Sequence, residues 1–179
     1  MSDEWSFKAG DFTRRKGTGA FGTRLRRLSE RLDRDVARLY ADFGVDFEPR
    51  WYPVVALLKE KQPLSVTEIA QELGLTHPAV SQVTRTLLEE GLIKATLDKK
   101  DERKKLLSLT KKAETRIEEL TPLWRAIIEA TDEIISTEVP GLLILLTELD
   151  EALDKESLGE RVQKHLAGER VQKHLKEDT

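Results

Sequence analysis

The sequence predicts a mostly α-helical protein with one small β-hairpin, and three observations lead to this expectation. Apolar residues recur at steps of three and four over most of the chain, which is the period of an amphipathic helix. The alternation typical of strands is confined to the stretch 92–109. A length of 179 residues fits one domain with helical extensions, and an apolar content of 39% is enough to build a core.

The amino-acid composition excludes several classes of function, among them those that need thiols, zinc clusters or a membrane span. The 30 Lys and Arg residues against 33 Asp and Glu residues give a net charge of −3, so the whole chain is not a strongly basic nucleic-acid binder. The absence of cysteine excludes disulfides and thiol chemistry, and three scattered histidines form no zinc cluster. No apolar run approaches the roughly 18 residues of a membrane span, and no secretion signal is visible. We therefore expect a cytoplasmic protein with no membrane partner, no cofactor and no metal.

The first long helix is predicted over residues 23–44, with Gly44 as its stop. Residues 1–22 are interpreted as a flexible lead. Gly17–Gly22 fits the pattern G-x-G-x-x-G, but no buried strand precedes it, so nucleotide binding is not expected. A second helix is predicted to begin near Pro49. The apolar stripe of the first helix consists of Leu25, Leu28, Leu32, Val36, Leu39 and Phe43.

Two short helices are predicted next. Ser65 and Glu68 have the spacing of a capping box, and Leu64 and Ile69 that of a hydrophobic staple. This helix is expected to end at Gly74, and Thr76 is expected to cap the following helix, with Pro78 in its first turn. The spacing of Ala70, Gly74, Val80 and Val83 is typical of a helix-turn-helix, which needs a small residue, a turn glycine and two inward anchors.

Strand alternation at Ile93 and Ala95, and again at Leu107 and Leu109, predicts a hairpin around a charged tip. Thr110 is expected to cap a long helix that ends at Pro140-Gly141, and a last helix begins at Leu142. A hairpin directly after a helix-turn-helix indicates a winged helix-turn-helix. The residues from 94 to 112 include eight basic and three acidic side chains, so the wing carries a local charge of +5.

The second short helix is the candidate recognition helix. If Val80, Val83 and Leu87 face the core, the opposite face consists of residue types that read base edges. A solvated face is the alternative. In the wing, basic side chains would neutralise phosphates, and an Arg at the tip would enter a narrow minor groove. The candidate DNA-binding residues are Thr76, His77, Pro78, Ser81, Gln82, Arg85, Lys99, Lys100, Arg103 and Lys105.

The tip Asp101-Glu102-Arg103, followed by Leu107-Ser108-Leu109-Thr110, resembles the Asp-x-Arg wing motif of the MarR family of winged-helix transcription regulators. The resemblance covers about residues 24–155. It implies that Arg103 reaches the minor groove, that Asp101 holds it in place, and that the protein is a homodimer. Under this scheme residues 23–158 form a single domain, with dimerisation helices at 23–44 and 110–158 and the winged helix-turn-helix at 46–109.

Two further expectations keep an alternative open. Many members of this family bind a small effector beside the winged domain, and Arg50, Trp51 and Tyr52 lie at the matching junction. These side chains would hold an aromatic anion, or they serve as core and hinge packing. The six arginines between residues 24 and 38 would pair with the C-terminal helices of the dimer, because residues 113–158 carry a charge of −9, or they would reach phosphates.

The tail 159–179 contains a repeat, because residues 159–166 recur unchanged at 168–175. The offset of nine residues would put the copies on opposite faces of a continuous helix. We interpret the repeat as a tandem duplication with a frayed second copy. A functional repeat is the alternative.

Taken together, the sequence predicts a homodimeric, sequence-specific binder of double-stranded DNA at pseudo-palindromic operators, with an effector as a candidate ligand. The alternative is a winged-helix module for protein contacts without DNA binding. No nucleophile with a base partner and no catalytic carboxylate pair stands out, so an enzyme is not expected.

Overall fold

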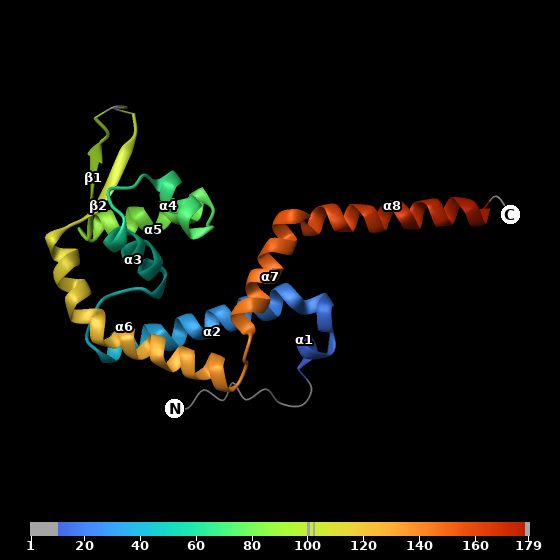
Figure 1. Ribbon diagram of the computed structural model, residues 1–179, viewed down its shortest axis with the longest axis horizontal. Helices are drawn as coiled ribbons and strands as arrows, with labels where there is room; N and C mark the ends of the chain where they lie inside the picture. The colour runs from blue at the N-terminus through green and yellow to red at the C-terminus, as the bar shows by residue number, and fades with distance from the viewer. Residues whose placement is uncertain (1–10, 100, 102, 178–179) are drawn as a thin grey trace. The chain divides into compact units, whose positions relative to one another are not determined.

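The computed structural model describes residues 11–99, 101 and 103–177 (Figure 1). The chain divides into two compact units, one ending at Thr121 and the other beginning at Pro122. The first unit contains the predicted helix-turn-helix and the predicted hairpin, and the second consists of helices. The expected fold class, mostly α with a β-hairpin wing, is confirmed.

The chain enters the first unit through short helical elements. Helix α1 spans Phe12–Arg15, the 3-10 turn η1 spans Gly17–Ala20, and α2 spans Phe21–Asp42. The side chain of Asp11 caps α1 and also accepts a 2.8 Å hydrogen bond from Arg27 of α2. Helix α2 begins two residues before the predicted start. Gly44, the predicted stop, lies just beyond its end with a φ of +68°.

Three helices form the winged domain. A 3-10 turn η2, Pro49–Trp51, leads into α3, Tyr52–Glu60, and is followed by α4, Val66–Leu73, and α5, His77–Glu89. Both predicted caps are present: Ser65 and Glu68 form a complete capping box, and the Thr76 hydroxyl accepts from the backbone N–H of Ala79. Gly74 ends α4 with a φ of +62°, a conformation that a residue with a Cβ rarely adopts.

Helices α4 and α5 pack against each other through buried side chains. Ile69 and Ala70 of α4 are buried, as are Val80 and Leu87 of α5. Val83, which the sequence assigned to the core, is only half-buried, and Thr84 is buried beside it instead. The Thr84 hydroxyl donates to the backbone carbonyl of Val80 at 2.9 Å, so a polar residue fits the core without an unpaired group.

The wing is an antiparallel hairpin of β1, Ile93–Leu97, and β2, Lys105–Leu109, with Ile93 opposite Leu109 and Leu97 opposite Lys105. Leu64 extends this small sheet, because its N–H and carbonyl exchange hydrogen bonds with Leu107 at 3.1 and 2.7 Å. The middle of β2 is therefore held by Leu64, the residue before the N-cap of α4.

Helix α6, Lys111–Thr137, begins at the predicted cap, because the Thr110 hydroxyl accepts from the N–H of Ala113. Helices α7, Leu142–Lys155, and α8, Leu158–Glu177, follow. Helix α8 runs through both copies of the repeat, so the second copy does not fray as predicted. Its Glu, Arg, Gln, Lys and Leu residues favour a helix, although Gly159 and Gly168 weaken it. Among the described residues, none of the helices combines the length and the apolar composition that crossing a membrane requires.

Candidate nucleic-acid interface

One face of α5 is polar and exposed. The six residues predicted to lie there are all exposed, and their backbone is helical or caps the helix. Val80, Thr84 and Leu87 occupy the opposite, buried face, which orients the exposed one outward. The exposed residues are Thr76, His77, Pro78, Ser81, Gln82 and Arg85.

Arg85 lies one helical turn before Glu89, with 4.0 Å between its Nε and the Glu89 Oε1. Both side chains are largely exposed, and an ion pair of this kind contributes little to stability. Since the contact is weak, the Arg85 guanidinium can exchange Glu89 for another acceptor at small cost.

The tip of the wing holds Arg103 through Asp101. The Asp101 carboxylate accepts hydrogen bonds from the backbone N–H of Arg103 at 3.1 Å and from its Nε at 3.2 Å. The Arg103 side chain is 93% exposed, so its two terminal nitrogens face solvent. This is the contact that the family resemblance implied. Lys99 and Lys105 are exposed on the same hairpin, whereas Lys100 lies outside the described residues.

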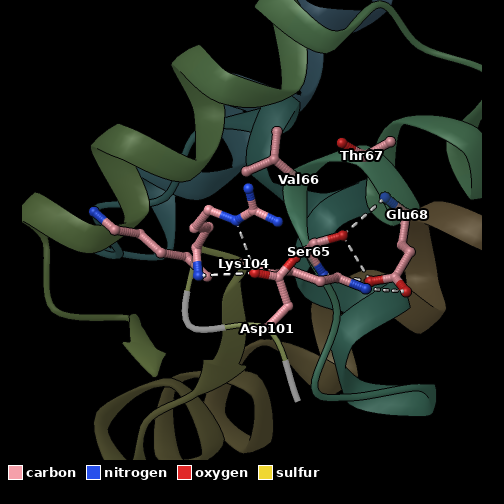
Figure 2. Close-up of a pocket in the computed structure, with 8 residues that line it drawn as sticks. Ser65, Val66, Thr67, Glu68, Asp101 and Lys104 are labelled. Carbon is pink, nitrogen blue, oxygen red and sulfur yellow. Dashed lines mark hydrogen bonds and ion pairs between the residues drawn. The ribbon is translucent and has the colours of Figure 1, made fainter. Parts of the chain in front are cut away.

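A contact that the sequence did not predict joins the wing to α4. Figure 2 shows Glu68 beside Ser65 and Lys104. The Glu68 carboxylate accepts from the Ser65 N–H at 2.7 Å, from the Ser65 hydroxyl at 2.6 Å and from the Lys104 Nζ at 2.9 Å. The capping box predicted the first half of this arrangement. The second half spans 36 residues of sequence, and no local pattern signals it.

A shallow surface pocket lies at this junction, with a volume of about 560 Å³. The first turn of α4 forms one wall and the wing tip forms the other. Three of its lining side chains are basic and two are acidic, and both acidic groups are hydrogen-bonded to basic ones. The residues that line it are Ser65, Val66, Thr67, Glu68, Asp101, Arg103, Lys104 and Lys105.

These contacts lower the pKa of Glu68 from 4.5 to about 2, because the hydroxyl and N–H of Ser65 and then the ammonium of Lys104 stabilise the carboxylate. The same partnership raises the pKa of Lys104, chiefly through its hydrogen bond to Glu68. Glu68 is therefore charged at neutral pH, and the link between α4 and the wing is an ion pair.

The depressed pKa of Glu68 makes part of the stability depend on pH. Its contribution is complete above the unfolded value of 4.5 and is lost as the pH falls toward about 2, because in this range the unfolded state binds a proton and the folded state does not. In urea denaturation, the stability difference between wild type and Glu68→Gln should shrink over this range. Glu72→Gln, on the same helix, should follow the wild type. A pH-independent difference for Glu68→Gln would contradict the assignment.

The predicted effector residues lie at the junction before α3. Trp51 is 3% exposed and packs edge-to-face on Phe47, with ring centroids 5.4 Å apart. Phe47 in turn packs on Tyr40 of α2 at 5.2 Å. Arg50 is exposed and pairs with Glu48, and Tyr52 is half-buried. The Trp51 Nε1 is buried and has no hydrogen-bond acceptor among the described residues.

The described part of the chain contains no group of three His, Asp or Glu side chains placed to hold a metal ion.

Comparison with known proteins agrees with this geometry. Residues 45–104, which run from before α3 to the wing tip, match the model of the MarR family. The HTH-type transcriptional regulator PapX of Escherichia coli is 26% identical over 95 residues, covering 53% of this chain and 58% of PapX. The chain spans only about half the length of the curated relatives it matches. The resemblance predicted from the wing motif is thus confirmed for the winged segment.

Solved structures show the same fold. The structure of the MepR–DNA complex of S. aureus has 21% identity and a TM-score of 0.59, and the alignment covers 75% of this chain and 97% of MepR. A structure of Bordetella bronchiseptica BpsR, described in terms of regulation of its DNA binding by 6-hydroxynicotinic acid, has 19% identity and a TM-score of 0.56. That alignment covers 74% of this chain and 91% of BpsR. The curated relatives are named as transcriptional regulators, in agreement with the prediction that this chain is not an enzyme.

Proposed function

Given its MarR-type winged helix-turn-helix, we propose that the chain is a homodimeric transcription regulator that binds specific sequences of double-stranded DNA. The observation that carries the proposal is the pairing of two surfaces in one unit. An exposed helix face offers Ser81, Gln82 and Arg85, and a basic hairpin presents an Arg103 held by Asp101. The first surface suits base edges in a major groove, and the second suits phosphates and a minor groove.

Charge supports this division of labour. The stretch 94–112 has a local charge of +5, while residues 113–158 carry −9. A basic wing supplies the part of DNA affinity that does not depend on sequence, because each neutralised phosphate releases counterions. The acidic helices would be repelled by DNA and are proposed to face away from it. The alternative of a pure protein-contact module gives no reason for a basic wing beside a polar helix face.

The proposed dimer rests on apolar surface that a single chain leaves exposed. Five consecutive apolar residues of α7, from Leu142 to Leu146, are all at least 36% exposed. On α2, most of the predicted apolar stripe is exposed as well, including Leu25, Leu28 and Leu32. Apolar surface of this extent on a monomer marks an interaction site. We propose that helices 23–44 and 110–158 dimerise, which would place two recognition helices about 34–36 Å apart.

Control by a small effector remains a proposal with one supporting observation. The buried Trp51 Nε1 is a donor without an acceptor among the described residues, and an anionic aromatic ligand at Arg50, Trp51 and Tyr52 would supply one. The edge-to-face packing of Trp51 on Phe47 supports the alternative hinge role. BpsR, whose DNA binding is described as regulated by 6-hydroxynicotinic acid, illustrates such an effector in a protein of the same fold.

Selection of binding sites from random duplexes tests the proposed function directly. The selected sites should be pseudo-palindromes whose half-sites lie one helical turn apart, because the proposed dimer has two-fold symmetry. Enrichment of sites without this symmetry would contradict the dimeric mode of binding. A failure to enrich any sequence would favour the protein-contact alternative.

Replacing Arg103 by Ala should weaken binding to every duplex to a similar degree and lower the salt dependence. Each protomer loses one cation at the DNA, so the slope of log affinity against log salt should fall by about one per wing. Titrations at several salt concentrations measure this slope. Lys59→Ala, which removes an exposed cation of α3 outside α5, the wing and the proposed dimerisation helices, is the control. Unchanged affinity of Arg103→Ala at about 150 mM salt would refute the wing assignment.

A further inference from the structure

The strands of the wing contact α3, α4 and α5, whereas its tip extends beyond this core. A two-stranded hairpin is marginally stable alone, so its direction is fixed by what holds its base. The backbone of Leu64 pairs with Leu107 in the middle of β2. Near the tip, the side chain of Lys104 donates a hydrogen bond to Glu68 of α4. Lys104 directly follows Arg103 in the sequence, so this contact lies close to the residue that is proposed to enter the minor groove.

Lys104 also belongs to the turn that presents Arg103. Its backbone N–H donates to the carbonyl of Asp101 at 2.8 Å, and its carbonyl accepts from the N–H of Asp98 at 2.9 Å. The Asp101 side chain in turn holds the Nε of Arg103. The contacts therefore form a chain from Glu68 through Lys104 and Asp101 to Arg103, as Figure 2 illustrates for its first members.

Glu68 is itself rigidly placed. Two hydrogen bonds from Ser65 hold its carboxylate at the first turn of α4, and its own N–H donates to the Ser65 hydroxyl at 3.3 Å. Helix α4 packs on α5, so a group fixed to α4 is fixed with respect to the recognition helix. A charged hydrogen bond from such a group transmits position better than a contact between two mobile side chains.

We propose that Glu68 is a positioning residue for the wing: through Lys104 it sets where Arg103 lies with respect to α5. The consequence for DNA rests on the proposed function, but the positioning itself is a property of the free protein. The inference assigns a second role to a capping residue, whose first role is to complete the N-terminus of α4.

The chain provides a matched control. Glu72, one turn further along α4, pairs with Lys61, which belongs to the segment before α4 and not to the wing. Glu72→Gln removes an ion pair from the same helix without touching the wing. Glu68→Gln keeps the capping box, since the amide oxygen also accepts from Ser65, and removes the charge and the second acceptor that Lys104 contacts.

Double electron–electron resonance between a spin label on α4 and another on the wing measures the position of the wing in the absence of DNA. The chain has no cysteine, so Gln71→Cys on α4 and Lys99→Cys on the wing provide unique labelling sites, and both residues are exposed. Glu68→Gln should broaden the distance distribution, and Glu72→Gln should leave it unchanged. Lys104→Met, which leaves the cap intact, should broaden it to the same extent. An unchanged distribution in both the Glu68 and Lys104 variants would overturn the proposal.

A double-mutant cycle extends the test to DNA. Glu68→Gln should weaken operator binding by about two- to fivefold, the range of a half-exposed ion pair. If Glu68 acts through the wing, the loss caused by Arg103→Ala should be smaller in the Glu68→Gln background. Additive losses would overturn the link to Arg103. If the wild type bound no duplex, the proposed function would fail, whereas the spin distances would still decide the role of Glu68.

Discussion

Replacing Leu145 by Asp is expected to convert the protein to a monomer and to abolish operator binding. Leu145 is 61% exposed in the single chain and lies on the apolar α7. A Leu side chain buried in an interface contributes about 1.5–3 kcal/mol, and a symmetric dimer loses two of them. The dimer should therefore weaken by about 10²- to 10⁴-fold, more if the carboxylate must be desolvated.

Sedimentation equilibrium measures this change, and Thr147→Asp is its control. Thr147 is a polar, exposed residue of the same helix, so replacing it by Asp adds the same charge without removing an apolar side chain. This control variant should stay dimeric and bind DNA. Wild-type protein that is monomeric at micromolar concentration would contradict the proposed assembly, and a dimeric Leu145→Asp would place the interface elsewhere.

The sequence predicted those parts of the fold that depend on neighbouring residues. Caps, turn glycines and strand alternation act within a few positions, so the roles of Ser65, Gly74 and Thr76 follow from the residues beside them. Rules based on neighbouring residues did not predict which side chain is buried at positions where packing between helices determines the core. Thr84 is buried in the core where Val83 was expected, and its hydroxyl is satisfied by the carbonyl of Val80 one turn earlier.

The wing shows the same limit at the candidate site. Its basic tip could be predicted from the residues themselves, and the Asp101–Arg103 contact was implied by the resemblance to the family's wing motif. The Glu68–Lys104 and Leu64–Leu107 contacts join segments about 40 residues apart, and no periodicity reports them. The net charge of −3 was a poor guide to a nucleic-acid partner for a related reason. It is the sum over the whole chain of opposite local charges, those of a basic wing and of acidic helices.

Replacing Gln82 or Arg85 by Ala should change which sequences the protein prefers more than how tightly it binds DNA in general. Both side chains are exposed on the polar face of α5, and their amide and guanidinium groups can contact adenine and guanine bidentately. Each lost contact should cost about 1–3 kcal/mol on the selected operator, roughly 5- to 150-fold, and little on duplexes altered at the contacted base pair.

The comparison that decides this is between base-pair variants of one operator at fixed salt. A base-reading role predicts that Arg85→Ala removes discrimination at one position of each half-site and leaves the salt slope nearly unchanged, the reverse of Arg103→Ala. Glu89→Gln removes the weak partner of Arg85 and should preserve the base preference. Equal losses on all duplexes would mean that Arg85 contacts phosphate, and the specificity of α5 would then depend on Ser81 and Gln82.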